Sequence, residues 1–191
     1  MDEIINIAGT VTDSIVDGPG IRYSIFAQGC AHNCLGCHNP HTHEFGIGKN
    51  VSVSELFSDI QKNPLVRGVT FSGGDPFYQS KGFAQLAQLL HQQKYEVACY
   101  TGFTWEHLVA LGSTEQQKLL SNLDILVDGP FLIMERNLDL LFRGSENQRI
   151  IDVPASLQAL AKQNGTELNP TGFRKTPVPS PILCTAKRWV G

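Results

Sequence analysis

The sequence lacks any long apolar run. None of its apolar stretches approaches the ~20 consecutive apolar residues that a membrane-spanning helix needs. The amino-terminal stretch MDEIINIAGTVTD carries two acids at once and no apolar core segment, which is unlike a secretory signal. These absences lead us to expect a cytoplasmic protein.

The sequence also lacks basic clusters. It has 15 Lys and Arg against 18 Asp and Glu, for a net charge of −3. No basic run stands out, so nucleic acid is a poor choice of partner. A hydrophobic fraction of 41% and a charged fraction of 17% exclude a disordered or fibrous chain. The length of 191 residues suggests one domain, at about 100–200 residues per domain.

Cysteine is scarce, but it is concentrated. The chain has five cysteines, and three of them, Cys30, Cys34 and Cys37, fall within GCAHNCLGC at residues 29–37. An odd number with a tight cluster, in a reducing compartment, favours a metal site or catalytic thiols over a disulfide framework.

Strand and helix patterns alternate along the chain, which predicts an α/β fold with a largely parallel sheet. Strands are expected at 21–28, 67–71, 96–100, 123–127 and 148–153, and helices near 53–62 and 79–93, at 104–111 and from 113. In such sheets, sites lie at the carboxyl ends of strands. The cysteine loop and the SGGDP, TGF and DGP stretches should therefore share one rim.

The carboxyl-terminal stretch differs in character from the rest. Four prolines follow residue 164 without a clear period. We expect one domain over residues 1–160 and an extended or loosely docked tail over 161–191.

Four interpretations of the cysteine loop compete on pattern alone. The thiols are buried structural cysteines, or they hold a structural zinc with a histidine as fourth ligand, or Cys34 and Cys37 form a redox pair, or the three thiolates hold a cubane iron–sulfur cluster with one open iron. Four histidines lie near enough in sequence to complete a zinc site: His32, His38, His41 and His43.

The C-x3-C-x2-C spacing of Cys30, Cys34 and Cys37 resembles the signature of radical S-adenosylmethionine enzymes. Ser72–Pro76, SGGDP, stands after a predicted strand, where that superfamily has its GGE-like motif. The resemblance implies one 4Fe-4S cluster on the three cysteines, with S-adenosylmethionine chelating the open iron. Its implied cofactor-binding residues are Gly36, Cys37, His38, Gly73, Gly74 and Asp75. Glycines let the backbone approach a ligand closely, and Asp75 places a negative charge near a bound ammonium.

Further motifs resemble the glycyl-radical enzyme activases within that superfamily. These are DGPGIR at 17–22, CHNP at 37–40, YTGF at 100–103, LVDGPF at 126–131 and FRGSENQRIID at 142–152. The chain is most similar to the family that activates anaerobic ribonucleoside-triphosphate reductase. The resemblance implies a truncated, incomplete (β/α) barrel that is open to a protein substrate, with an electron donor such as flavodoxin. It also implies that a 5′-deoxyadenosyl radical removes hydrogen from a glycine of the reductase, and the residues themselves are assigned no catalytic role beyond holding the cofactors.

Other functions stay open beside this one. They are an activase of another glycyl-radical enzyme of the pyruvate formate-lyase type, a radical enzyme acting on a small molecule, and a non-enzymatic zinc-binding module. Individual residues also have two interpretations. Thr101 and Asp128 either line a cofactor or cation site or form turns. Arg143 and Arg149 either meet a carboxylate or lie on the surface. Cys99 is expected to be a buried apolar residue, and Cys184 is assigned no role.

Overall fold

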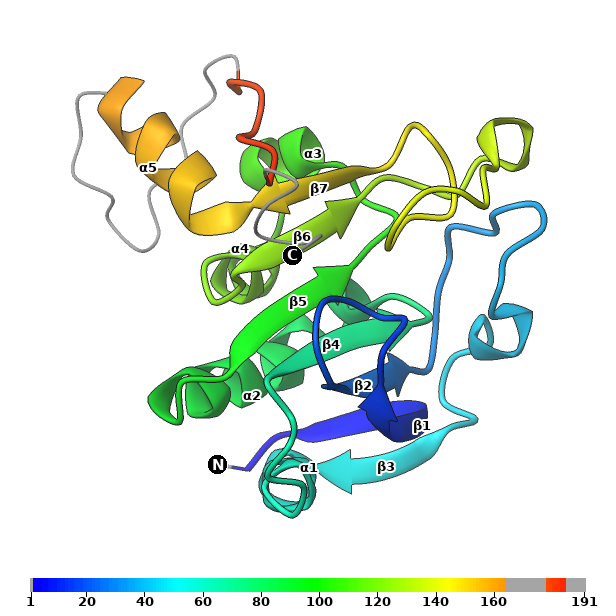
Figure 1. Cartoon of the computed structure of the whole chain (residues 1–191), viewed down its shortest axis with the longest axis vertical. Helices are drawn as coiled ribbons and strands as arrows, with labels where there is room; N and C mark the ends of the chain where they lie inside the picture. Colours follow the sequence, from blue (N-terminus) through cyan, green and yellow to red (C-terminus); the bar gives the residue numbers. More distant parts are fainter. Residues whose placement is uncertain (1, 164–177, 185–191) are drawn as a thin grey trace.

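A computed structural model describes residues 2–163 and 178–184, and within them an open, seven-stranded mixed sheet carries helices on one face (Figure 1). The strand order is β3-β1-β2-β4-β5-β6-β7. The strands are β1 (Ile4–Ser14), β2 (Arg22–Ala27), β3 (Lys49–Ser52), β4 (Gly68–Gly73), β5 (Glu96–Tyr100), β6 (Ile125–Asp128) and β7 (Arg149–Asp152). The helices are α1 (Val53–Ile60), α2 (Ser80–Gln92), α3 (Trp105–Leu111), α4 (Thr114–Leu120) and α5 (Val153–Gln163), with short 3-10 turns η1 (Pro40–Thr42), η2 (Pro76–Gln79) and η3 (Ile133–Glu135).

The centre of the sheet is parallel, as the alternation of strands and helices predicts. β2, β4, β5 and β6 run in the same direction, joined through α1, α2 and the α3–α4 pair. The outer pairings are antiparallel: β1 with β2 and β3, and β7 with β6. The chain is therefore mixed α/β, with three antiparallel strands added around a parallel core.

Helix ends follow the capping chemistry of the sequence. Ser113 and Gln116 form a complete capping box at the start of α4, as their spacing predicts. At α1 the Ser52 hydroxyl accepts a hydrogen bond from the backbone N–H of Glu55 at 3.2 Å. The starts of α1 and α4 are thus set by local hydrogen bonds.

The core lies between the sheet and the helices. Alternate residues of β2, such as Tyr23 and Ile25, are at most 1% exposed and pack with α1 and α2 residues including Leu56, Phe83 and Leu86. Cys99 on β5 belongs to this core with no exposed surface, which confirms that it is a buried apolar residue.

The opposite face of the sheet is more polar. The side chain of Arg22 is 1% exposed, and its Nε donates to Thr70 Oγ1 at 2.6 Å while Nη1 pairs with Glu96 at 3.0 Å. Burial lowers the pKa of Arg22, and Glu96 opposes that shift, so the guanidinium stays charged. The segment between β1 and β2, which carries the DGPG motif, crosses this face: Thr70 Oγ1 donates to the carbonyl of Asp17 at 2.9 Å.

The described part of the tail adds to the edge of the sheet. The backbone N–H of Asp152 donates to Ile182 O, and that of Cys184 donates to Ile150 O, both at 2.9 Å. Ile182 N donates to the Ser156 hydroxyl at 2.8 Å. Residues 164–177 and 185–191 of the expected tail lie outside the described residues, and α5 runs to Gln163. No helix of the described residues is long and apolar enough to cross a bilayer.

Candidate active site

The carboxyl ends of the parallel strands meet long loops at one rim of the molecule. In Figure 1 the arrowheads of β4, β5 and β6 point toward this rim, where the segment after β2 and the segment between β6 and β7 lie next to each other. A cavity of about 450 Å³ opens there. It is lined by residues from all four strand ends, among them Cys30, Cys34, Cys37, His38, Ser72, Gly73, Gly74, Thr101, Gly129 and Phe131.

The cysteine loop has a defined backbone. Its base is closed by hydrogen bonds from Gly29 N to Thr42 O at 2.8 Å and from Cys30 N to His43 O at 3.0 Å. Its tip is a turn in which Cys37 N donates to Cys34 O at 3.1 Å, with Gly36 at a φ of 74°. That positive φ is a reason for glycine at position 36, because L side chains avoid it.

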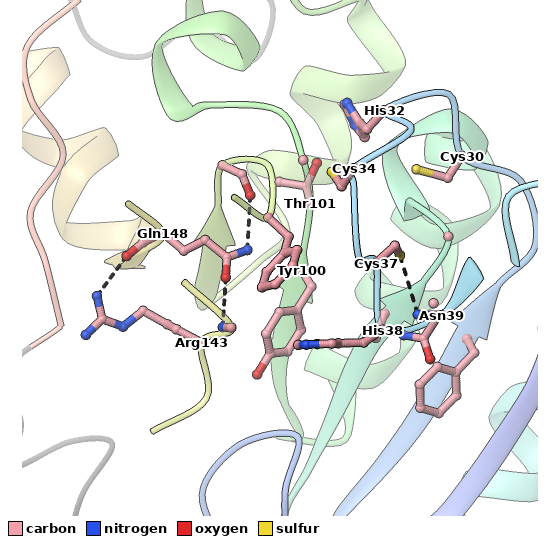
Figure 2. Close-up of a pocket in the computed structure, with 18 of the residues that line it drawn as sticks. Cys30, His32, Cys34, Cys37, His38, Asn39, Tyr100, Thr101, Arg143 and Gln148 are labelled. Carbon is pink, nitrogen blue, oxygen red and sulfur yellow. Dashed lines mark hydrogen bonds between the residues drawn. The ribbon is translucent and has the colours of Figure 1, made fainter. Parts of the chain in front are cut away.

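The three thiols of this loop line the same cavity (Figure 2). All three are partly exposed and none is in a disulfide. Partial burial raises the pKa of the Cys30 thiol to about 11, and the Asp75 carboxylate and the neighbouring thiols add to the rise. A positively charged metal bound beside such a thiol would favour its thiolate form at neutral pH.

Asp75 connects the loop after β4 to two other loops of the rim, the cysteine loop and the loop after β5. Its side chain has no exposed surface, and Oδ2 contacts His32 Nε2 at 2.7 Å, Thr101 Oγ1 at 2.8 Å and Gly102 N at 3.0 Å. Oδ1 accepts from Phe77 N at 2.9 Å. The carboxylate thus holds the cysteine loop, through His32, against the loop that follows β5.

The glycines before Asp75 sit against backbone. A Cβ on Gly74 would come within 2.5 Å of Gly29 O and 2.9 Å of Thr42 O. Gly73 has a φ of 95°, and a Cβ there would meet the backbone of Ala27 at 2.6 Å. The SGGDP loop can therefore pack against the base of the cysteine loop only because both positions lack a side chain.

The implied cofactor residues fall into two groups. Cys37, His38, Gly73 and Gly74 line the cavity, whereas Gly36 and Asp75 do not. The ring of His38 packs on Phe131, with 4.8 Å between centroids. Of the other histidines considered as zinc ligands, His32 contacts Asp75, His41 is exposed, and His43 lines the cavity.

Thr101 and Asp128, at the ends of neighbouring strands, differ in their relation to the cavity. Thr101 lines the cavity and donates to Asp75, while Asp128 is 1% exposed and faces away into an ion pair. Arg149 Nε donates to Asp128 Oδ1 at 3.0 Å, and its Nη2 contacts Asp128 and Glu106. The hydrogen bonds that Arg149 donates to Asp128 and Glu106 raise its pKa, so this arginine is a structural residue of the rim.

Arg143 reaches the cavity from the segment between β6 and β7 (Figure 2). Its Nη1 donates to Gln148 O at 2.8 Å, and its Nε is buried without a partner among the described residues. Tyr100 and Gln148, which lie in the YTGF and FRGSENQRIID motifs but had no individual role predicted for them, line the same cavity. Burial raises the pKa of Tyr100, which stays a neutral phenol and donates to Phe142 O at 3.0 Å.

The donor set fits an iron–sulfur cluster. Three cysteine thiols face one cavity, and thiolates are the ligands that iron–sulfur clusters take from proteins. The other two cysteines stand elsewhere: Cys99 is fully buried in β5, and Cys184 is beside Ile150 on β7. Within the described residues no three His, Cys, Asp or Glu side chains are grouped to hold a single metal ion.

Comparisons with known proteins agree with this chemistry. A family model described as a 4Fe-4S single cluster domain matches residues 16–151. A curated relative from Vibrio cholerae, named anaerobic ribonucleoside-triphosphate reductase-activating protein, is 34% identical over 145 residues, covering 71% of this chain and 90% of the relative.

A relative of the same name from Enterobacteria phage T4 is 32% identical, over 71% of this chain and 86% of its own length. Among solved structures, QueE from Escherichia coli matches with a TM-score of 0.46 and 21% identity, over 54% of each chain.

Proposed function

The chain belongs to the 4Fe-4S single cluster domain family and to the family of anaerobic ribonucleoside-triphosphate reductase-activating proteins, and we propose that it acts as a radical S-adenosylmethionine activase of such a reductase. Its substrate is then a glycine of the reductase, from which one hydrogen atom is removed. The electron donor that fits this chemistry is a small redox protein such as flavodoxin.

The observation that carries the proposal is the meeting of three cysteines and the SGGDP loop at one open cavity. Cys30, Cys34 and Cys37 line this cavity and would supply three ligands, and the described chain brings no fourth cysteine to them. A four-iron cluster with three protein thiolates keeps one iron open. When bound, the cluster and S-adenosylmethionine together supply the 5′-deoxyadenosyl radical that takes the hydrogen atom.

The protein's own residues then serve to hold and orient. The three cysteines would hold the cluster, and the backbone of Gly73 and Gly74, which lines the cavity, would contact the amino end of S-adenosylmethionine. Asp75 does not line the cavity itself, because its carboxylate is buried and hydrogen-bonded to His32, Thr101 and Gly102. We therefore assign Asp75 to positioning of the loops, with its negative charge acting on the ammonium only at a distance.

The open sheet suits a protein substrate. Its edges are β3 and β7, and residues 182–184 pair with β7 instead of a further parallel strand. We interpret residues 1–160 as a truncated, incomplete radical S-adenosylmethionine barrel. The cavity lies at the rim of this open sheet, and there a loop of the reductase, whose glycine must leave its own fold, would reach the cofactor.

The choice of partner is tested by paired activation. The protein, loaded with iron and sulfide, is incubated without air with S-adenosylmethionine, a reductant and either the reductase or pyruvate formate-lyase, and each target is then assayed for its own activity. We expect the reductase to become active and the lyase to stay inactive. Efficient activation of the lyase with an inactive reductase would overturn the choice of partner.

A further inference from the structure

An apolar groove adjoins the cysteine loop on the side of the segment that follows β6. It has a volume of about 330 Å³. It lies between the tip of the cysteine loop, at Cys34 and Leu35, and the stretch Pro130–Glu135, which includes η3. Leu132, Ile133 and Met134 supply most of its second wall.

The groove is continuous with the active-site cavity. His32, Cys34 and Phe131 line both. A chain segment that entered the cavity at the cysteine loop would therefore lie over the groove as it left.

The apolar side chains around the groove are unusually exposed. Met134 is 92% exposed, Leu35 is 76% exposed and Ile133 is 42% exposed. Val16, which lines the adjoining cavity, is 74% exposed. Large apolar side chains that gather beside a site mark an interaction surface, and methionine is a common residue at such surfaces.

The groove wall is held in place before any partner arrives. The backbone N–H of Leu132 donates to Ser145 Oγ at 3.2 Å, and Glu146 N donates to Glu135 O at 2.9 Å. Arg136 and Ser145 form an antiparallel bridge. Because this wall is already ordered, binding a side chain against it loses little conformational entropy.

We propose that this groove binds a large apolar side chain of the reductase segment that carries the reactive glycine, and so sets the depth at which the glycine enters the cavity. The inference rests on the proposed function. Hydrogen-atom transfer needs the glycine in contact with the cofactor, so the substrate segment must cover the cavity mouth and its adjoining wall. An electron donor has no such need for contact, which is why we assign the groove to the substrate.

The test replaces Met134 by Glu, because a carboxylate in the groove opposes burial of an apolar partner side chain. Met134→Leu is the conservative control. Leu65→Glu is the matched control elsewhere, because Leu65 is 62% exposed and precedes β4 at the opposite end of the sheet. Two quantities are measured on the cluster-loaded protein: the Kd for the purified reductase, and the rate of 5′-deoxyadenosine release without the reductase.

We expect Met134→Glu to raise the Kd by about tenfold or more, as loss of a central interface residue does. The release of 5′-deoxyadenosine should stay at the wild-type rate, and both controls should bind like wild type. If Met134→Glu binds the reductase like wild type, the groove assignment is wrong. The assignment is also wrong if Met134→Glu activates the reductase slowly with a flavodoxin-type electron donor but at the wild-type rate with a chemical reductant. That result would mean that the electron donor, and not the reductase, binds in the groove. If the wild-type protein itself neither binds nor activates the reductase, the proposed function fails instead.

Discussion

Replacement of Asp75 by Asn tests how the rim is held together. The Asp75 carboxylate is fully buried and takes donors on both oxygens: Phe77 N on Oδ1, and His32, Thr101 and Gly102 N on Oδ2. An amide has one acceptor oxygen only. Whichever way it is turned, its NH2 group faces a backbone N–H that has no other partner in this arrangement, at Phe77 or at Gly102.

A buried donor left without an acceptor costs about 1–3 kcal/mol, and hydrogen bonds to a charged group are each stronger than neutral ones. We therefore expect Asp75→Asn to lower the free energy of unfolding by about 2–4 kcal/mol. In a chain of this size that corresponds to about 5–15 °C in Tm. Thr101→Val, which removes the donor to Asp75 and the acceptor of Phe103 N, should cost about 1–2 kcal/mol.

The measurement is denaturant unfolding of the cluster-loaded protein under anaerobic conditions, together with its iron content after gel filtration. Asp13→Asn is the matched control, since Asp13 is exposed on β1. We expect Asp75→Asn to lose iron faster than wild type because the cysteine loop is no longer tied to the rim. A variant with wild-type stability and iron content but weaker S-adenosylmethionine binding would refute this, and would show that Asp75 acts chiefly as the counter-charge of the ammonium.

Three other changes have outcomes set by the same geometry. Cys34→Ala should abolish retention of iron and sulfide, whereas Cys99→Ala should retain both; equal loss in the two variants would indicate a four-cysteine site. Arg149→Met should lower the free energy of unfolding by about 3–5 kcal/mol, because it leaves the buried Asp128 carboxylate without its cation; a loss below about 1 kcal/mol in denaturant unfolding would contradict the structural role of this pair. A chain that ends at Gln163 should still form the glycyl radical but unfold at lower temperature, because β7 loses its hydrogen bonds to residues 182–184; a stable truncated chain unable to form the radical would mean that the tail contributes to the site.

The central strands and helices could be predicted from the sequence because their signals are local. The period of α2 and the capping box of α4 lie within single segments, and the structure confirms both. β1 and β3 were not expected, since they are antiparallel additions whose formation depends on pairing with each other and with β2. α5 was not predicted from the sequence, although Leu157 and Leu160 pack against the core.

The sequence motifs predict which loops form the candidate site. The cysteine spacing and the glycines identify which loops meet at the rim, and the structure brings them to one cavity. A motif does not determine the direction in which a side chain points, because that direction depends on contacts with other segments. Asp75 turns inward because two loops distant in sequence offer hydrogen-bond partners to its carboxylate, at His32 and at Thr101–Gly102, and Asp128 turns to Arg149 for the same reason. The apolar groove depends on two segments about 100 residues apart in sequence, so no local pattern indicates it.

The most direct test of the account is electron paramagnetic resonance of the reductase after anaerobic incubation with this protein, S-adenosylmethionine and a reductant. We predict a doublet resonance that collapses to a single line when the glycine α-position of the reductase carries deuterium. No radical signal on the reductase, with the protein carrying its full complement of iron and sulfide, would contradict the account.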